Sequence, residues 1–318
     1  MRARNEVSRR EWLATTTLAA AGLAPNPFAE SAAAQQPPSD GFRSLFDGQT
    51  LKGWKAVPRL QIPGGEKWDT LPAEELKPAL VEMMNKTEAG RKRISHVGRW
   101  EVVDGAIIGG QEPAGSGLGG YLLTEESFVD FELEVDARPD WPIDTGIMFR
   151  THEELGTAGF QLLVDHRPRG MIGGIFGNGI GSFHARTFGV GGDEGDDFKV
   201  LNFREAPRED HFDFPDLRYG ATFAVFGKAW RTNDWNRFRL RCVGDLPVIT
   251  TWINDVKIME MDARTLDTEG YDAELLKRRI GNKGRIGFEV HNNGLRMGRN
   301  RWAKGAVSRW RNIRIKTL

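Results

Sequence analysis

The stretch Phe131-Glu132-Leu133-Glu134-Val135-Asp136-Ala137-Arg138 alternates strictly between apolar and charged residues. Residues 237–243 (RFRLRCV) repeat the pattern, with arginines between Phe, Leu and Cys. Because side chains alternate between the two faces of a β-strand, each stretch predicts an antiparallel strand with one buried and one wet face. The runs 248–253 and 256–261 flank the pair Asn254-Asp255, which is typical of a two-residue hairpin turn.

Further short strands are expected along the rest of the chain, at residues 100–103, 106–109, 121–124, 145–150, 160–166, 285–291 and 311–317. Helical patterns are sparse. Residues 72–84 and 271–279 are helical candidates, Pro78 should limit the first to short pieces, and residues 193–217 read as a long loop. Many short strands joined by Gly-rich turns predict an all-β fold, a jelly roll or β-sandwich with short helical insertions.

Composition excludes several classes of function. The chain has 318 residues, with 44 Lys+Arg against 44 Asp+Glu, and therefore lacks the basic excess that nucleic acid or a polybasic membrane contact requires. Its single cysteine, Cys242, excludes an internal disulfide and any multi-cysteine metal site, and its place in a strand predicts that it is buried. No segment after the N-terminal region is long and apolar enough for a membrane span.

The N-terminal residues have the order of an export signal. Arg9 and Arg10 precede a weakly apolar stretch, residues 14–24, and residues 32–34 (Ala-Ala-Ala) offer a cleavage site. This predicts a twin-arginine-type signal peptide over residues 1–34, a linker over 35–40 and a single domain over 41–318. An ordinary Sec signal with a chance arginine pair is the alternative. Either signal would export the protein to the periplasm or the extracellular space.

Three strands place polar residues opposite their apolar side: Gly146–Arg150, Gly159–His166 and Gly287–His291. The polar positions are Arg150, Gln161, Asp165, Glu289 and His291. A mixed set of this kind on one sheet face predicts a polar cleft, because the other wet strands carry mainly Lys, Arg and Glu. The alternative is a solvated sheet face with ordinary polar residues.

Glu289 and His291 are two residues apart, so they share a face at a Cα separation of about 7 Å. That spacing suits an acid/base pair or two ligands of one metal ion. His184 borders the Gly-rich segment 170–192, although a lone histidine is more often a surface or core-edge residue than a ligand. The chain has no G-x-S-x-G elbow, no H-E-x-x-H and no complete G-x-G-x-x-G, which argues against serine hydrolases, zincins and dinucleotide enzymes.

Several motifs in this order resemble the 3-keto-disaccharide hydrolase domain family. They are Gly41-Phe42-Arg43-Ser44-Leu45-Phe46-Asp47-Gly48, Leu51-Lys52-Gly53-Trp54, Trp100-Glu101-Val102-Val103-Asp104-Gly105, Tyr121-Leu122-Leu123-Thr124, Asp130-Phe131-Glu132-Leu133, Thr145-Gly146-Ile147 with Arg150, Asp234-Trp235-Asn236, Trp252-Ile253-Asn254 and Arg311-Asn312-Ile313-Arg314-Ile315. The resemblance implies a concanavalin A-like jelly roll and a carbohydrate substrate. The chain departs from the family pattern at Gln161, where a carboxylate is usual, at Leu163, where an amide is usual, and at Glu289, where a Gln is usual.

The resemblance implies an exported enzyme that cleaves 3-keto-glycosides or 3-keto-disaccharides. A base would remove the C2 proton, and a cationic group would hold the resulting enolate. Glu289 or Asp165 is expected as the base, His291 as an acid or metal ligand, and Arg150 or a divalent metal ion as the enolate partner. The residues expected to bind the sugar are Gln161, Trp100 and His184. A non-catalytic lectin-like module and a structural or adhesion domain are the alternatives, and the sequence leaves the oligomeric state open.

Overall fold

The computed structural model describes residues 40–153, 155–207, 215–293 and 301–318, all within the compact unit Pro37–Leu318. The predicted signal peptide, residues 1–34, and nearly all of the predicted linker lie outside the described residues. Among the described residues, no helix has the length and apolar character needed to cross a membrane.

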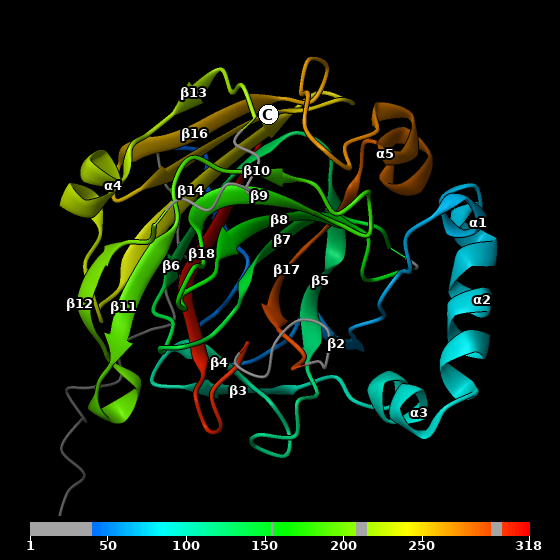
Figure 1. The fold of residues 1–318 in the computed structure, drawn as a ribbon, viewed down its shortest axis with the longest axis horizontal. Coiled ribbons are helices and arrows are strands. Elements are labelled where there is room, and N and C mark those ends of the chain that lie inside the picture. The colour runs from blue at the N-terminus through cyan, green and yellow to red at the C-terminus, as the bar shows by residue number, and fades with distance from the viewer. Residues whose placement is uncertain (1–39, 154, 208–214, 294–300) are drawn as a thin grey trace, which may run out of the picture. The chain divides into compact units, whose positions relative to one another are not determined.

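The larger of two facing antiparallel sheets has nine strands among the described residues (Figure 1). In spatial order they are β13 (Tyr219–Gly220), β16 (Val256–Asp262), β15 (Val248–Ile253), β14 (Asn236–Val243), β6 (Phe131–Ala137), β18 (Ser308–Thr317), β4 (Ala106–Gly110) and β3 (Arg99–Val103), with β1 (Arg43–Ser44) paired to β18. Strand β6 alternates between buried and half-buried residues along its whole length, as the sequence predicted. The hairpin at Asn254-Asp255 is also confirmed, since it joins β15 and β16.

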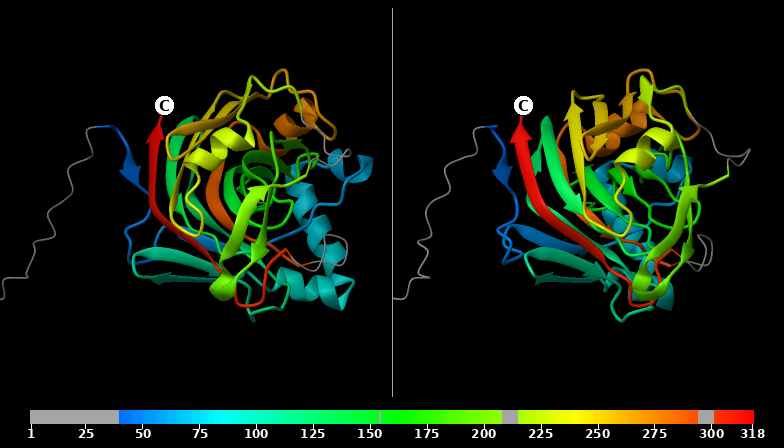
Figure 2. Two further views of the ribbon diagram at one scale, coloured as in Figure 1. Left: turned by 60° about the vertical axis from the view of Figure 1, so that its left-hand side comes forward. Right: turned by 90° about the vertical axis from the view of Figure 1, so that its left-hand side faces the viewer.

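The second sheet carries the polar face that the sequence predicted. Its described strands are, in spatial order, β10 (His184–Ala185), β9 (Ile172–Asn178), β8 (Gly159–Val164), β7 (Gly146–Thr151), β17 (Gly284–Val290), β5 (Gly120–Phe128) and β2 (Trp54–Pro58). All residues of β7 and β8 are buried, so both faces of this sheet are covered at its centre. The two sheets form separate layers in the turned views of Figure 2, where β18 is red and β17 orange.

The core lies between the two sheets. Phe288 of β17 stacks between Trp54 of β2 and Trp310 of β18, with ring centroids 5.4 and 4.4 Å away. Cys242 is buried in this core, and burial raises the pKa of its thiol to about 12, which keeps it inert. The architecture confirms the all-β, concanavalin A-like jelly-roll β-sandwich with short helical insertions.

The helical insertions are α1 (Glu66–Asp69), α2 (Ala73–Asn85), α3 (Glu88–Ile94), α4 (Phe223–Ala229) and α5 (Ala273–Ile280). Figure 1 shows α1, α2 and α3, in cyan, beside the β2 end of the second sheet. The expectation that Pro78 would break the helix was wrong, because α2 runs through it. Proline has no N–H to donate to the carbonyl oxygen of Glu74, but Pro78 and Glu74 are both exposed, so water can take the place of that hydrogen bond. Leu76 and Leu80 pack in the core and hold the helix on the sheet.

The expected long loop at residues 193–217 was also partly wrong. Its first part forms the end of β11 (Val190–Glu194), a short 3-10 turn (Asp196–Phe198) and β12 (Val200–Glu205), which pairs with β11. The ladder is short and mostly exposed, so its strands lack the apolar alternation by which a strand is recognised in sequence.

Candidate active site

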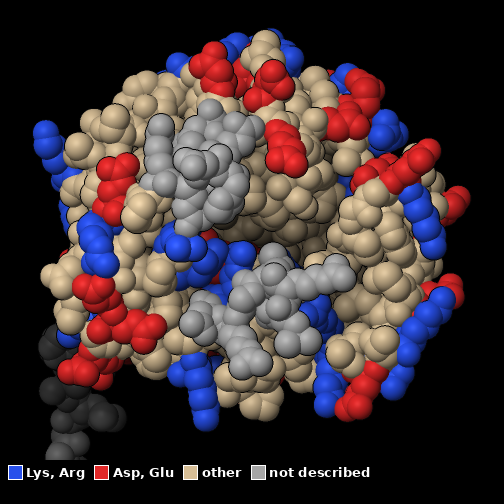
Figure 3. Space-filling model, in the orientation of Figure 1, with Lys and Arg blue, Asp and Glu red and all other residues tan. Residues whose placement is uncertain are grey.

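A cavity of about 310 Å³ opens on the face of the second sheet that points away from the core. Its wall is formed by five arginines, two aspartates, two histidines, one glutamine and three apolar residues. They are Arg59, Arg167, Arg169, Arg186, Arg301, Asp144, Asp165, His184, His291, Gln161, Leu163, Met171 and Phe176. In Figure 3, the hollow near the centre of the view shows the blue of Lys and Arg side chains.

The ends of neighbouring strands supply the acidic and imidazole groups of this cavity. Asp144 precedes β7, Asp165 follows β8 directly and His291 follows β17 directly. All three are buried, as are Gln161 and Glu289 on the same sheet face. The alternative of a solvated sheet face is therefore wrong.

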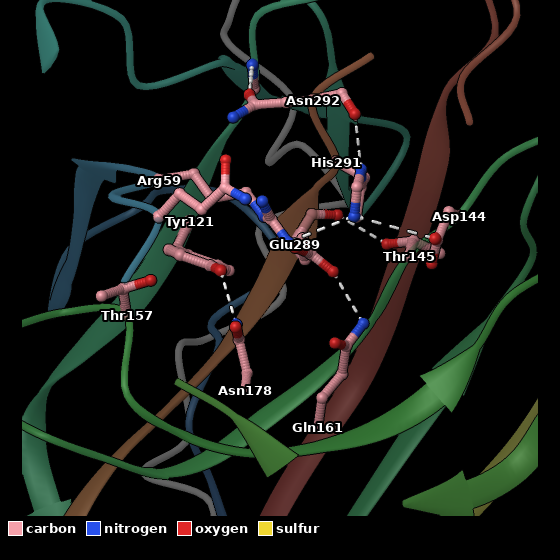
Figure 4. Close-up of polar contacts among 12 residues, drawn as sticks. Arg59, Tyr121, Asp144, Thr145, Thr157, Gln161, Asn178, Glu289, His291 and Asn292 are labelled. Carbon is pink, nitrogen blue, oxygen red and sulfur yellow. Dashed lines mark hydrogen bonds and ion pairs between the residues drawn. The ribbon is translucent and has the colours of Figure 1, made fainter. Parts of the chain in front are cut away.

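Glu289 lies beneath the cavity and has no exposed surface. Its Oε1 accepts a hydrogen bond from Arg59 Nε at 2.5 Å, and its Oε2 accepts one from Gln161 Nε2 at 2.6 Å. Burial raises the pKa of Glu289, and the positive charge of Arg59 opposes that rise. Both carboxylate oxygens of Glu289 accept hydrogen bonds, and Glu289 does not line the cavity. Glu289 therefore holds Arg59 in position (Figure 4).

His291 is held as a neutral ring by two contacts. Its Nδ1 lies 2.6 Å from the carbonyl oxygen of Asn292, which can only accept, so Nδ1 carries the proton. Its Nε2 lies 3.1 Å from Arg59 Nη2, a donor, so Nε2 accepts. Burial and the neighbouring Arg59 lower the pKa of His291 to about 3. The predicted pairing of Glu289 and His291 on one face is confirmed, with Arg59 bridging them (Figure 4), but a ring that is neutral at pH 7 is a poor proton donor.

Asp144 and Asp165 form a pair of carboxyl groups with opposite properties. Burial favours a higher pKa for Asp144, but the positive charges of Arg301 and Arg167 keep the pKa of Asp144 below its ordinary value. Arg301 Nη1 binds Asp144 Oδ2 directly, whereas Arg167 Nε lies 2.8 Å from Asp165 Oδ1. Burial, followed by the negative charge of Asp144, raises the pKa of Asp165 to about 8. Asp165 is therefore a cavity-lining carboxyl group that can take up or release a proton near neutral pH.

His184 and Gln161, which were predicted to contact the sugar, both line the cavity. His184 lies at the exposed rim, where its ring packs on Phe176 at a centroid distance of 4.8 Å. Partial burial and the positive charges of Arg186 and Arg301 lower the pKa of His184.

Two predicted site residues lie elsewhere. Arg150 has a φ of 49°, which breaks the alternation of β7, and its Nη2 bonds Asp130 Oδ1 and the carbonyl oxygen of Gly244. Its side chain therefore contacts the ends of β6 and β14 in the other sheet. Trp100 donates Nε1–H to the carbonyl oxygen of Val97 and packs on the small cluster around Trp302, so it does not line the cavity.

Sequence reasoning missed most of the charged wall. Asp144 lies directly before the Thr145-Gly146-Ile147 motif, but no pattern in the sequence indicated that its side chain belongs to the site. Arg59 follows β2 at the far edge of the sheet, and only tertiary structure brings it to Glu289. Arg167 is two residues beyond Asp165 and could have been suggested by strand alternation continued past the strand end.

The donor set does not suit the divalent metal ion considered from the sequence. The described residues contain no group of three or more His, Cys, Asp or Glu side chains placed to hold one. His291 Nε2 and Asp144 Oδ2 lie 3.8 Å apart, but guanidinium groups already occupy both atoms. We therefore derive no chemical step through a metal ion.

Similar solved structures share the sandwich at low identity. One is provisionally named a glycosyl hydrolase of Parabacteroides distasonis (13% identity, 88% of this chain and 94% of that chain covered, TM-score 0.44). Another is the carbohydrate-binding module CBM66 of Bacillus subtilis (13% identity, 69% and 92% covered, TM-score 0.35). A likeness at this level carries no argument about function. No curated protein matches the chain.

The family comparison is the informative one. The model of the 3-keto-alpha-glucoside-1,2-lyase-like domain matches residues 41–316, which is nearly the whole described part of the chain. It confirms the resemblance that the opening, strand and closing motifs indicated. With a carbohydrate-processing family matched over this length and a titratable, arginine-lined cavity on its sheet, the chain belongs to the 3-keto-alpha-glucoside-1,2-lyase-like domain family.

Proposed function

We propose that this chain cleaves the glycosidic bond of 3-keto-glycosides by elimination, with Asp165 as the general base. The observation that carries the proposal is the buried Asp165 carboxyl group in a cavity lined by five arginines. Its burial, followed by the negative charge of Asp144, raises the pKa of Asp165 to about 8, which suits proton transfer near neutral pH. The family match supports the class of substrate.

The reaction needs only a base, a cationic partner and water. The C3 carbonyl acidifies the C2–H bond, Asp165 takes the C2 proton, and the electron pair forms an enolate. Collapse of the enolate makes the C1=C2 double bond and breaks the C1–O bond, and the departing oxygen takes up a proton. Water then adds its oxygen to C1 and a proton to C2, so the net result is hydrolysis.

The arginines of the wall suit the negative charge that develops on the C3 oxygen. Arg59 is fixed by Glu289 and His291, and Arg301 is fixed by Asp144, so neither guanidinium group has to reorganise during the reaction. Arg150, which was expected in this role, is excluded by its contacts with Asp130 and Gly244. His291 acts as a positioning residue for Arg59.

The test is turnover of a panel of 3-keto-disaccharides in heavy water. We expect release of the free sugar with deuterium at C2 of the keto product. Asp165→Asn should slow release by about 100-fold or more, whereas the exposed control Asp193→Asn should not change it. A product without deuterium at C2 would indicate direct hydrolysis by two carboxyl groups. Binding without any release would indicate a carbohydrate-binding module.

A further inference from the structure

The apolar residues of the cavity wall lie to one side of the proposed base. Leu163 belongs to β8, Met171 directly precedes β9 and Phe176 belongs to β9. Asp165 directly follows β8, and Arg59 follows β2 at the other edge of the sheet (Figure 1). In the strand order β10-β9-β8-β7-β17-β5-β2, the base therefore stands between an apolar group on the β8–β9 side and Arg59 on the β2 side.

Phe176 continues a row of side chains that begins at Gln161. Gln161 of β8 and His184 of β10 are both direct partners of Phe176 in the strand register. Partners of this kind project from the same face of a sheet, and all three residues line the cavity. The rings of Phe176 and His184 lie 4.8 Å apart between centroids, at an interplanar angle of 43°. Together they form an aromatic surface in the cavity wall.

Phe176 is a half-buried residue within a buried stretch of β9. Residues 172–175 and 177 are buried, so the exposed part of the Phe176 ring faces the cavity that it lines. A Cβ at Gly174, on the same face of the strand, would lie 2.2 Å from Met171 Cε. The Met171 side chain therefore covers the backbone next to Phe176 and extends the apolar surface.

His184 adds an uncharged ring to this surface. Burial, followed by the positive charges of Arg186 and Arg301, lowers the pKa of His184 to about 4. The ring is therefore neutral at pH 7, and it can pack on an apolar group while its nitrogens contact hydroxyl groups. A sugar ring offers both features, because its C–H faces are apolar and its edges carry hydroxyl groups.

The aromatic surface lies beside the position of the base. Gln161 and Asp165 are four residues apart along one strand direction, which corresponds to about 13 Å at the rise of an extended chain. Phe176 is the partner of Gln161 on the next strand. At that separation, Asp165 and Phe176 contact different parts of a substrate.

The elimination itself determines the direction in which the leaving group points. The sugar carbon C2 is bonded to C3, whose oxygen becomes the enolate, and to C1, whose oxygen departs, so the two oxygens lie on opposite sides of C2. Arg59 and Arg301, the proposed partners of the enolate, contact Glu289 and Asp144 on the β7–β17 side of β8. With C2 at Asp165, the C1–O bond therefore points towards β9 and β10.

We propose that Phe176, His184 and Met171 form the subsite for the leaving group of the substrate, and that this group is a second sugar ring. The proposal rests on the proposed function for the bond that is cleaved. Packing of the C–H face of the ring on Phe176 removes apolar surface from water on both partners. The chain should therefore prefer 3-keto-disaccharides to 3-keto-glycosides with a small leaving group.

The test compares two substrates that differ only in the leaving group. A 3-keto-disaccharide and the methyl 3-keto-glucoside of the same anomeric configuration share the reacting ring, and only the disaccharide has a second ring to place on Phe176. Phe176→Ala should lower kcat/KM for the disaccharide by about 10-fold, the size expected for the loss of one aromatic contact, and keep the methyl glycoside within about 2-fold of the parent. The ratio of the two losses is independent of the intrinsic reactivity of each leaving group and of the amount of folded protein.

Further variants separate packing on a ring from a general loss of structure. Phe176→Trp keeps an aromatic face and should retain the preference for the disaccharide, and His184→Phe should retain more of it than His184→Ala. Phe198→Ala is the matched control, because Phe198 is an exposed phenylalanine that does not line the cavity. Equal losses for both substrates in Phe176→Ala, or no loss for either, would overturn the proposal. Equal losses in His184→Phe and His184→Ala would overturn the packing role of His184.

A binding measurement distinguishes failure of the subsite from failure of the proposed function. The unoxidised disaccharide and methyl glucoside lack the C3 carbonyl and cannot undergo the elimination, so calorimetric titration measures their binding alone. We expect tighter binding of the disaccharide to the parent and loss of this preference in Phe176→Ala. If the preference is lost in this way and no 3-keto-glycoside is cleaved, the subsite stands and the proposed reaction fails. If 3-keto-disaccharides are cleaved and Phe176→Ala leaves both preferences unchanged, the reaction stands and the subsite fails.

Discussion

The strand pattern predicted that Glu289 and His291 lie together, but it did not predict Arg59, which contacts both. Glu289 and His291 share a face because they are two apart on one strand, which is local information. Arg59 is separated from Glu289 by 230 residues, and no local pattern records that contact. The roles of Glu289 and His291 depend on this unseen cation, so the sequence could place them together but could not assign their chemistry.

Asp165 should reduce the stability of the folded protein as pH rises. Its folded pKa of about 8 is raised above the value of the unfolded chain, so between about pH 4 and pH 8 the folded state holds a proton that the unfolded state releases. Stability from this group is thus lost across that window. Asp165→Asn does not titrate and should melt about 2–4 °C or more above the parent at pH 8.

Calorimetric scans from pH 5 to pH 9 would measure this difference. The gap between Asp165→Asn and the parent should widen as pH rises, while Asp193→Asn, on an exposed ladder, should follow the parent throughout. Parallel curves for Asp165→Asn and the parent would mean that the Asp165 carboxyl group titrates normally in the folded state, and the assignment of Asp165 as base would lose its basis.

Glu289→Gln should change the rate and leave the titrating group in place. The substitution keeps an oxygen for Arg59 but removes the charge that fixes its guanidinium group. We expect kcat to fall by roughly 10-fold, the value of one charge-assisted contact, with kcat/KM still dependent on a group near pH 8. Pre-steady-state and steady-state pH profiles would check this. Loss of the pH dependence in this variant would identify Glu289 itself as the base.

At the scale of the element, the strands of the second sheet position the site through close backbone contacts. Gly146 on β7 pairs with Leu163 on β8 and lies against the side chain of Gln161. A Cβ at residue 146 would lie 2.6 Å from the Gln161 side chain and 2.7 Å from the carbonyl oxygen of Leu162. Gly146→Ala should therefore displace the amide that binds Glu289 Oε2.

Gly146→Ala is expected to lower the melting temperature by roughly 2–4 °C, for about 1 kcal/mol of strain, and to reduce turnover as well. Gly64→Ala is the control, since a Cβ there has no atom within 4 Å and its backbone is not in the left-handed region. An unchanged Gly146→Ala protein would show that Gln161 can move without loss, and its contact with Glu289 would then be dispensable.

Some helices and strands could be predicted from their sequences and others could not. Strands β6 and β14 were visible because each has one wet face, and α2 and α5 were visible because they bury a stripe. Helix α4 was missed because its seven residues bury only Phe226 and show no helical period. The bend at Arg150 was not predicted, because an arginine with a positive φ is uncommon and the alternation of apolar and polar residues does not reveal it.

At the scale of the whole molecule, the arginine pair belongs to residues 1–34, outside the described part of the chain. We propose that the arginine pair directs export through the twin-arginine pathway, followed by cleavage after Ala34. The double variant Arg9→Lys, Arg10→Lys should accumulate uncleaved in the cytoplasm of the expressing bacterium, as measured by cell fractionation and mass determination. Undiminished export of the double variant would indicate the Sec route.

The order of strands also governs when the chain can fold during synthesis. The last strand, β18, lies inside its sheet between β6 and β4, and the late strand β17 lies between β7 and β5. A ribosome-bound chain that ends before residue 284 therefore leaves β6, β4 and β1 of one sheet and β7 and β5 of the other each without the strand partner that β18 or β17 provides, and such edges pair readily with other chains. Both sheets can therefore close only after β17 and β18 have been synthesised, and until then the nascent chain carries open strand edges in both layers.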